Sequence, residues 1–239
     1  MTEDAEKRRY WLMKAEGEPR YVKGINVAFT FEMLEEITED GKMESWSGVR
    51  NYEARNMIRD EIKIGDYAFL YCSNCKFPHI KGVMRICSNS HPDDSAWNSN
   101  DPYYDPKSTP QNPRWYSVGV QSEYKLDRPV TLRELKMHKE NQLKSMELLN
   151  RSRLSISRVK PEEWKFIHEL SKQPEPEEII KARLQEEEKV AKRKRKLNLS
   201  DGENKAKSPY SSISENDASL DIIKRSRIKD VRSQKDNAL

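Results

Sequence analysis

The residues best suited to chemistry lie in two short runs, 46–56 and 66–76. The first run combines a Trp, a Gly and an Arg-Asn pair, and the second is an aromatic strand that ends in Ser-Asn. Aromatic faces supply stacking, and amide, hydroxyl and backbone groups supply hydrogen bonds, so these types predict a pocket for a flat, polar group. Neither run places a nucleophile beside a base. The alternative is that the aromatic residues are simply core and that the Asn is only a helix cap.

Helices and strands must bring these two runs together, and periodicity and capping residues predict where they lie. The expected strands cover 10–15, 67–72, 81–87, 115–124 with an extension over 126–130, and 154–159; the expected helices cover 30–41, 51–62 and 143–150 and begin at 131 and 161. Strands and helices alternate without a regular βαβ repeat, and no Gly-rich phosphate loop follows a strand. The pattern therefore predicts an α+β fold, a small, mostly antiparallel barrel decorated with helices. Residues 88–114 are expected to form a long loop of functional importance.

Composition divides the 239-residue chain into a folded part and a tail. Of the 5 Trp, 10 Tyr and 5 Phe residues, all except Tyr210 lie in residues 1–170. The remainder has too little apolar surface to offset the entropy of ordering the chain. We expect a disordered N-terminus over 1–8, one domain over 9–172, and a mostly disordered tail over 173–239 in which 177–197 could form a charged helix.

The net charge of +4 resides in the tail, because residues 1–170 contain 27 Lys+Arg and 27 Asp+Glu whereas the rest contains 17 and 13. A neutral body argues against strong non-specific binding to duplex phosphates by the body alone. The tail carries a basic run made of Lys192, Arg193, Lys194, Arg195 and Lys196. Such a run predicts a nuclear localisation signal or a phosphate anchor without sequence preference; a merely solvated charge run is the alternative.

Three cysteines, Cys72, Cys75 and Cys87, form an odd set without a signal peptide, which indicates a reducing compartment. The Cys72-x-x-Cys75 spacing raises the possibility of zinc or redox chemistry, but the other nearby ligands, Cys87, His79 and His91, form no second close pair. Residues three apart on a strand also point to opposite faces. We therefore expect no metal and no cofactor. No run approaches the ~20 apolar residues of a membrane span, so no membrane partner is expected.

Four ordered motifs resemble the EVE domain family. They are Trp46-x-Gly-Val-Arg-Asn-Tyr-x-Ala-Arg-Asn56, Phe69-x-Tyr-x-Ser-Asn-Cys75, Asn112-Pro-x-Trp115 and Arg151-x-Arg-Leu-Ser-Ile156. The resemblance covers roughly 9–170 and implies a PUA-like barrel related to YTH domains, a superfamily that tends to bind nucleic acids. Several members enclose one modified base in an aromatic cage, and EVE domains have been proposed to read modified cytosine or adenine in DNA. This chain departs from the family pattern at Gly119, where an acidic residue is common, and at Cys72, where close relatives have His.

The resemblance implies a base pocket, and the charge pattern adds phosphate contacts beside it. The residues expected to line or support the pocket are Trp11, Lys14, Trp46, Val49, Asn51, Tyr71, Ser73, Asn74 and Trp115. The residues expected to contact phosphates are Arg50, Arg55 and Lys76. No residue is assigned a catalytic role.

The sequence leads to the hypothesis of a monomeric, nuclear nucleic-acid-binding module that recognises one modified base, with modified cytosine in DNA as the candidate. Its partners would be nucleic acid and, through the tail, the nuclear import machinery. Two alternatives stay open: a protein–protein adaptor with a vestigial pocket, and an RNA-binding module that reads a methylated base. A hydrolase or transferase is disfavoured, because the sequence shows no Ser-His-Asp, paired-carboxylate or phosphate-loop arrangement.

The basic run makes a first prediction about location. Replacing all five residues of 192–196 by Gln should abolish nuclear enrichment of a fluorescently tagged full chain, because nuclear localisation signals depend on clustered positive charge. The control replaces the second basic cluster, Lys224, Arg225, Arg227 and Lys229. An unchanged nuclear signal after the first replacement, measured as the nuclear-to-cytoplasmic ratio, would remove the localisation role from this run.

Overall fold

The computed structural model describes the backbone of residues 8–205 and the side chains of residues 8–192. The strands are β1 (Tyr10–Glu16), β2 (Tyr21–Val22), β3 (Ile25–Asn26), β4 (Glu44–Ser45), β5 (Tyr67–Ser73), β6 (His79–Ile86), β7 (His91–Pro92), β8 (Tyr116–Ser117), β9 (Gly119–Thr131) and β10 (Ile156–Val159). The helices are α1 (Phe31–Glu39), α2 (Tyr52–Asn56), α3 (Leu132–Met137), α4 (Glu147–Asn150), α5 (Pro161–Lys172) and α6 (Glu177–Lys205), with a π turn over Met57–Glu61 and a 3₁₀ turn over Asp94–Ala96.

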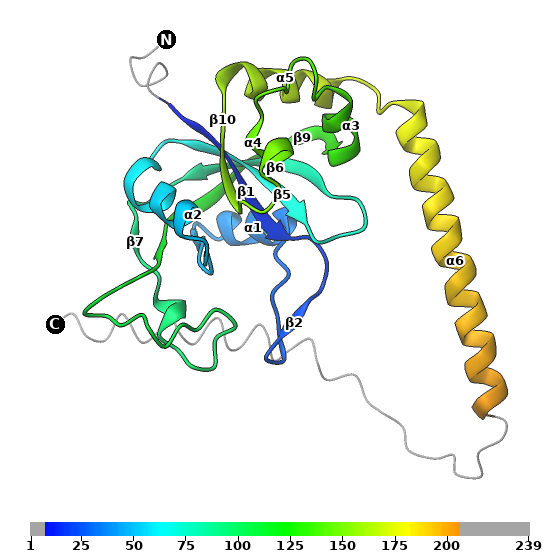
Figure 1. The fold of residues 1–239 in the computed structure, drawn as a ribbon, viewed down its shortest axis with the longest axis horizontal. Helices are drawn as coiled ribbons and strands as arrows, with labels where there is room; N and C mark the ends of the chain where they lie inside the picture. Colours follow the sequence, from blue (N-terminus) through cyan, green and yellow to red (C-terminus); the bar gives the residue numbers. More distant parts are fainter. Residues whose placement is uncertain (1–7, 206–239) are drawn as a thin grey trace. The chain divides into compact units, whose positions relative to one another are not determined.

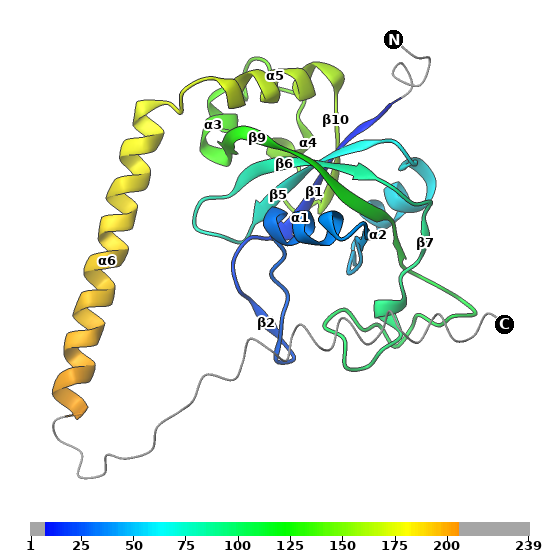
Figure 2. The same ribbon diagram turned by 180° about the vertical axis from the view of Figure 1, so that it is seen from behind.

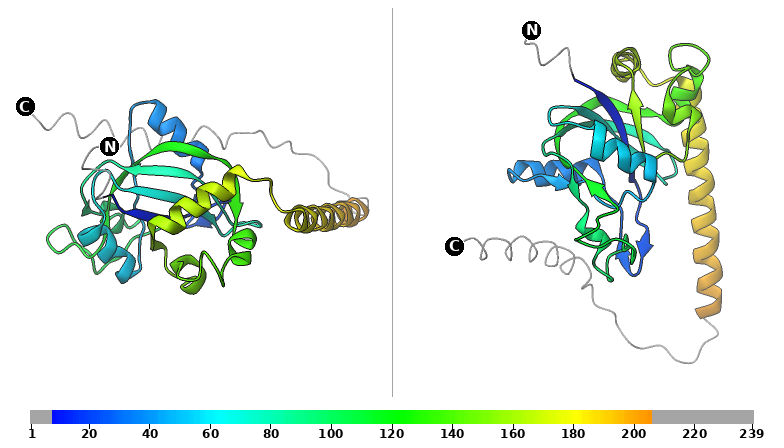
Figure 3. Two further views of the ribbon diagram at one scale, coloured as in Figure 1. Left: turned by 90° about the horizontal axis from the view of Figure 1, so that it is seen from above. Right: turned by 60° about the vertical axis from the view of Figure 1, so that its left-hand side comes forward.

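Six strands form one curled sheet in the order β10-β1-β5-β6-β9-β4 (Figures 1 and 2). β1 and β5 pair in parallel, and the other four pairs in this sheet are antiparallel. The sheet forms a half-barrel with helices packed against it, as Figure 3 shows from two further sides. The predicted α+β class, a PUA-like mixed barrel decorated with helices, is confirmed.

The central strands are apolar along their whole length because both faces of the sheet are covered there. On β1, Trp11 and Met13 point into a core that includes residues of α1 and α2, whereas Leu12 points into a second core that includes residues of α5. Phe69 of β5 joins Leu12 in that second core. Since successive side chains alternate between the cores, a slip of one residue would exchange every contact, and the register of β1 is firmly set.

The predicted helix starts are confirmed by their caps. The side chains of Thr30, Asn51 and Thr131 each accept a hydrogen bond from the backbone three residues later. The helix expected over 51–62 is wrong in its second half, which widens into the π turn and turns both Met57 and Ile58 into the core. The helix expected over 143–150 is confined to α4.

The segment after residue 172 contains α6, which continues to Lys205 and extends the charged helix considered over 177–197. The expected disorder of the rest of the tail stays a prediction. Ion pairs at i,i+4 spacing, Lys181 with Glu177 at 3.0 Å and Lys192 with Glu188 at 3.7 Å, support this helix. Each exposed pair of this kind contributes only ~0.3–0.5 kcal/mol. Residues 1–7 and 206–239, which include most of the expected disordered N-terminus and the second basic cluster, lie outside the described residues. None of the helices in the described part of the chain is long and apolar enough to cross a membrane.

Asp66 holds the start of β5 against β1 from a buried position. Its carboxylate accepts hydrogen bonds from Trp11 Nε1 at 2.9 Å, the Arg9 amide at 3.1 Å and the Lys63 amide at 3.0 Å. A buried charge is tolerated only when it is hydrogen-bonded, and here three donors satisfy it. The indole N–H of Trp11 is thereby committed to the core, which gives this tryptophan a structural role.

Candidate functional site

The parallel pairing of β1 and β5 places the carboxyl ends of both strands at one edge of the sheet. In the register of this pair, Glu16 lies opposite Ser73. Ser73 Oγ donates to the Ala15 carbonyl at 2.8 Å, and the Gly17 amide donates to the Ser73 carbonyl at 2.8 Å. Polar groups from the last residue of each strand are therefore held side by side. We call this region, with Glu16, Ser73 and Asn74 at its centre, the β1–β5 edge.

Glu16 is the charged group of the β1–β5 edge. Its carboxylate accepts from Asn74 Nδ2 at 3.0 and 2.9 Å and from Arg20 Nη2 at 2.8 Å. Asn74 reaches it from a left-handed backbone conformation, φ 48°, which Asn tolerates better than most residues. A carboxylate has about four acceptor positions, so Glu16 retains capacity for a further donor.

Two aromatic side chains flank the β1–β5 edge. The Phe29 amide donates to the Glu16 carbonyl at 3.0 Å, which ties this residue to the end of β1. Its ring meets the ring of Trp46 edge to face, with centroids 6.0 Å apart and an interplanar angle of 84°. Trp46 is 7% exposed and belongs to the core, so little of its side chain is open to a ligand.

The loop after Trp46 fits against Tyr103 only because residue 48 is glycine. Gly48 has φ 80°, and a Cβ there would lie 2.7 Å from the ring of Tyr103. Burial raises the pKa of the Tyr103 phenol, and Glu16 raises it further, whereas Arg20 lowers it. The Tyr103 hydroxyl therefore stays protonated at neutral pH and can donate a hydrogen bond close to Glu16 and Arg20.

A buried ion pair fixes the loop that carries Tyr103. Arg50 Nη1 donates to Asp93 Oδ2 at 2.8 Å, and Asp93 Oδ2 also accepts from the Gly48 amide at 2.9 Å. The other donors of Arg50 bind the carbonyls of Tyr103 and Val49 and the hydroxyl of Ser95. All five guanidinium N–H groups are thus occupied within the protein. This arrangement leaves Arg50 no guanidinium donor for a phosphate, and its phosphate contact stays a prediction.

A second aromatic group lies on the side of α2. Tyr52, which is 50% exposed, stacks on Trp115 with centroids 5.0 Å apart and an interplanar angle of 30°. The guanidinium of Arg55 lies 5.1 Å from the centroid of Tyr52 and that of Arg114 5.7 Å from it. Stacked rings flanked by arginines combine π faces with positive charge, which suits an unpaired base or a phosphate.

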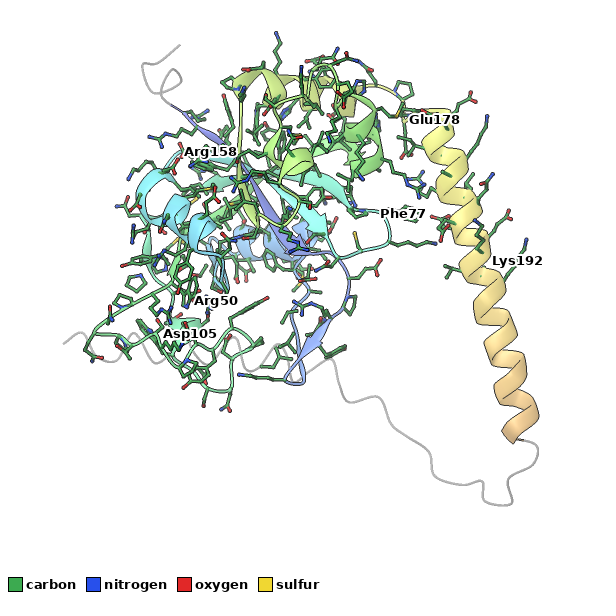
Figure 4. The ribbon with its side chains drawn as sticks, in the orientation of Figure 1. Arg50, Phe77, Asp105, Arg158, Glu178 and Lys192 are labelled. Atoms are coloured by element: carbon green, nitrogen blue, oxygen red, sulfur yellow. The ribbon has the colours of Figure 1, made fainter. Side chains whose placement is uncertain are left out.

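The Asp105 carboxylate orients Trp115 and Arg114 in this second group. Its carboxylate accepts from Trp115 Nε1 at 2.7 Å and from Arg114 Nη1 at 3.4 Å. The backbone N–H of Lys107, the indole of Trp115 and the arginines together hold the pKa of Asp105 below its usual value. Figure 4 labels Arg50 and Asp105, which lie on the same side of the domain.

The structure gathers four predicted pocket residues at or beside the β1–β5 edge, namely Trp46, Val49, Ser73 and Asn74. Asn51 caps α2 through its side-chain oxygen, and Trp115 lies beneath Tyr52. Both are thus placed with the second aromatic group. Their contact with a base stays a prediction, as does the lining role of the first four.

Three predicted pocket residues lie elsewhere. Trp11 is 1% exposed and offers no face to a ligand. Tyr71 points into the core opposite to that of Trp46, because strand alternation directs it there. Lys14 lies 5.9 Å from the Tyr71 ring and donates to the Ser152 carbonyl at 2.7 Å. Burial lowers the pKa of Lys14. The structure leaves these three a supporting rather than a lining position, and their part in a pocket stays a prediction.

Of the other predicted phosphate contacts, Arg55 and Lys76 both reach the surface. Arg55 donates to the Arg114 carbonyl and to Asn56 Oδ1, while the ammonium of Lys76 lies 5.0 Å from the ring centroid of Phe77. Their phosphate role stays a prediction. The backbone of 192–196 lies within α6.

Sequence reasoning missed Glu16, Arg20, Phe29 and Tyr103. Glu16 carried a usable signal, since it directly follows the first predicted strand, 10–15, and precedes a glycine. The other three are brought to the edge by loops whose course no local pattern predicts. These four residues add a carboxylate, that of Glu16, and its hydrogen-bond partners to the aromatic side chains that the sequence had indicated.

The two family departures have structural explanations. A Cβ at Gly119 would lie 2.6 Å from Met43 Sδ and 3.0 Å from Ser88 Oγ, and strand alternation points it away from the core of Val118 and Val120. Position 119 therefore does not face Trp46. Cys72 is buried, and burial raises its pKa to about 12, so it is an unreactive thiol.

The cysteine pair also has a different arrangement from the one expected. Cys75 lies beyond the end of β5 and packs against the same core as Cys72, although residues three apart on a strand were expected on opposite faces. Both are free thiols. Among the side chains of residues 8–192, no group of three or more from His, Cys, Asp and Glu is arranged to hold a metal ion.

The curled mixed sheet, with a polar edge where its parallel pair ends, defines a PUA-like domain. The family model described as "EVE domain" matches residues 9–170, so the chain belongs to the EVE domain family. Thymocyte nuclear protein 1 of Rattus norvegicus is 43% identical over 164 residues, 66% of this chain and 71% of that protein. Thymocyte nuclear protein 1 of Homo sapiens is 42% identical over 164 residues, 66% of this chain and 72% of that protein.

Solved structures with the same fold include one with DNA. The human THYN1 protein in complex with 5-methylcytosine containing DNA is 41% identical and has a TM-score of 0.66, with 70% of this chain and 99% of that chain covered. A hypothetical protein from Leishmania major is 32% identical, with a TM-score of 0.60 over 70% of this chain and 97% of that chain.

The Asp93 carboxylate supports a prediction about the loop. Asp93→Ala removes the acceptor of the Gly48 amide and of Arg50, so hydrogen exchange in residues 95–105 should accelerate by about tenfold or more. Asp94→Ala, one residue further on, is the matched control and should leave exchange unchanged. Unaltered exchange in the Asp93 variant would contradict the role assigned to the ion pair.

Proposed function

We propose that this chain binds DNA that contains a modified cytosine and holds that one base, turned out of the helix, at the β1–β5 edge. The observation that carries the proposal is the likeness of this chain to the human THYN1 protein solved with 5-methylcytosine containing DNA, which covers nearly the whole of the human chain. The edge itself supports the proposal, because it combines a carboxylate with spare acceptor capacity, an amide, a protonated phenol and a neighbouring aromatic pair.

The polar groups match the edge of cytosine. Cytosine presents an exocyclic amine as a donor, and a carboxylate is the side chain that accepts from it. Glu16 supplies that carboxylate, and the Tyr103 hydroxyl and Arg20 supply donors for the ring nitrogen and carbonyl of the base. Glu16 therefore reads the identity of the base, and the donors around it fix the orientation.

Recognition of the modification depends on apolar contact. One buried methyl contributes about 0.8 kcal/mol, or about fourfold in affinity. Phe29, whose amide binds the Glu16 carbonyl and whose ring contacts Trp46, would supply such surface. A larger preference than about fourfold requires that the methyl also improve the fit of the polar contacts.

The proposal includes location and mode of action. Relatives at about this level of identity are named thymocyte nuclear protein 1, and the basic run at 192–196 would bring the chain to the nucleus through the import machinery. The chain would act there as a monomeric binding module without a catalytic step or cofactor. Its domain would comprise 9–172, followed by the charged tail.

Glu16→Gln tests the base contact. The change keeps the side-chain shape but removes the charge, so affinity for DNA with cytosine or 5-methylcytosine at the extruded position should fall about tenfold, while binding to DNA with thymine at that position stays the same. Fluorescence polarisation with matched DNA and RNA oligonucleotides measures both. Glu36→Gln on α1 is the control for charge alone. Equal losses on DNA with cytosine and DNA with thymine at that position would refute base reading by Glu16, and a preference for modified RNA would favour the RNA alternative.

Arg55→Ala tests the second aromatic group. Phosphate attraction is independent of the base, so this change should weaken binding to modified and unmodified DNA by the same factor. The slope of log affinity against log salt should become shallower by about one. Arg59→Ala, which removes an arginine paired with its neighbour Asp60, is the matched control. A selective loss on modified DNA would instead assign Arg55 to the base.

A further inference from the structure

The hairpin formed by β2 and β3 projects from the same edge of the domain as the candidate site (Figures 1 and 3). Its two legs begin at Glu16 and end at Phe29, both of which belong to the β1–β5 edge. At its base, the Val27 amide donates to the Arg20 carbonyl at 2.9 Å, and Arg20 is the residue that pairs with Glu16. Any ligand held at Glu16 therefore lies at the foot of this hairpin.

The turn of the hairpin is stiff. Lys23 and Gly24 both have positive φ, 50° and 79°, the arrangement of a two-residue type I′ turn that matches the twist of the strands. Lys23 Nζ donates to the carbonyls of Ser99 and Asp101 at 3.0 and 2.9 Å. The tip is thus fastened to the loop that carries Tyr103.

The hairpin exposes apolar side chains on both of its faces. Tyr21 is 69% exposed and Ile25 is 44% exposed. Tyr21 is paired with Asn26 and Ile25 with Val22, so Tyr21 and Ile25 point to opposite faces of the ribbon. A two-stranded ribbon has no core of its own, so these side chains contribute little to folding. Exposed apolar groups gathered at a rigid tip indicate contact with a partner.

A protein that extrudes a base from a duplex can use exposed apolar side chains to fill the space that the base leaves. The extruded base leaves a gap in the stack, and the loss of stacking costs a few kcal/mol. Proteins that open base steps commonly insert an apolar side chain into them. The major groove, about 12 Å wide, admits a two-stranded ribbon.

We propose that the β2–β3 hairpin enters the duplex beside the extruded base, and that Tyr21, the more exposed of the two apolar side chains, fills the space which the base leaves. This inference rests on the proposed function, because it presupposes a base at Glu16. It adds a separate requirement: the hairpin is needed for duplex DNA, in which a gap must be filled, and dispensable for single strands, in which no stack is opened.

The test compares the full-length double variant Tyr21→Ala/Ile25→Ala with the wild type on single-stranded and duplex oligonucleotides that contain one 5-methylcytosine. We expect duplex affinity to fall about tenfold or more and single-strand affinity to change less than twofold. Tyr21→Phe should bind as the wild type, since the ring fills the gap. Ile64→Ala, an exposed apolar residue beside the start of β5, is the matched control. A duplex with an abasic site opposite the modified base should reduce the loss.

The outcomes separate the hairpin from the base site. Equal losses on single strands and duplexes, or no loss on either, would overturn the hairpin's role while leaving base reading intact. A wild type without preference for the modified single strand would overturn the proposed function itself, and with it the hairpin inference.

Discussion

The parallel pairing of β1 with β5 is the constraint on which the site depends. In an antiparallel pair, neighbouring strands end at opposite edges, and Glu16 and Asn74 would lie a strand length apart. The one parallel pair in the six-stranded sheet brings both carboxyl ends to the same edge. The buried carboxylate of Asp66, bonded to the indole of Trp11, holds the other end of the same pair. One electrostatic contact at the start of β5 therefore secures the register that assembles polar groups at its end.

The loops at that edge are positioned by a second buried carboxylate. Asp93 satisfies the Gly48 amide and Arg50 together, and Arg50 in turn holds the carbonyl of Tyr103. Two segments more than 40 residues apart in sequence are thereby locked into one surface. The positive charge of Arg50, which a sequence-based analysis assigns to phosphates, is used within the protein. Pre-organisation of this kind lowers the entropy lost when a ligand binds.

Local signals predicted local structure well. The caps at Thr30, Asn51 and Thr131 depend on a side chain and an amide three residues apart, so the sequence contains the whole interaction. The positions of the site residues depend on pairings between distant segments, which no local pattern in the sequence contains. Trp11 and Tyr71 have the right types for a base cage, but strand alternation directs them into two separate cores. Tyr103 reaches Gly48 only through the Arg50–Asp93 contact, which periodicity cannot reveal.

The position of β1 also governs when the domain can fold. This first strand lies between β5 and β10, and Tyr10 pairs with both Tyr67 and Val159. The backbone groups of Tyr10–Met13 that face β10 therefore have no partner until the last strand has been synthesised. Contacts so distant in sequence slow folding, because much of the chain must lose its freedom before they form. During synthesis on the ribosome, β1 presents an open strand edge to other chains for nearly the whole time of translation of the domain.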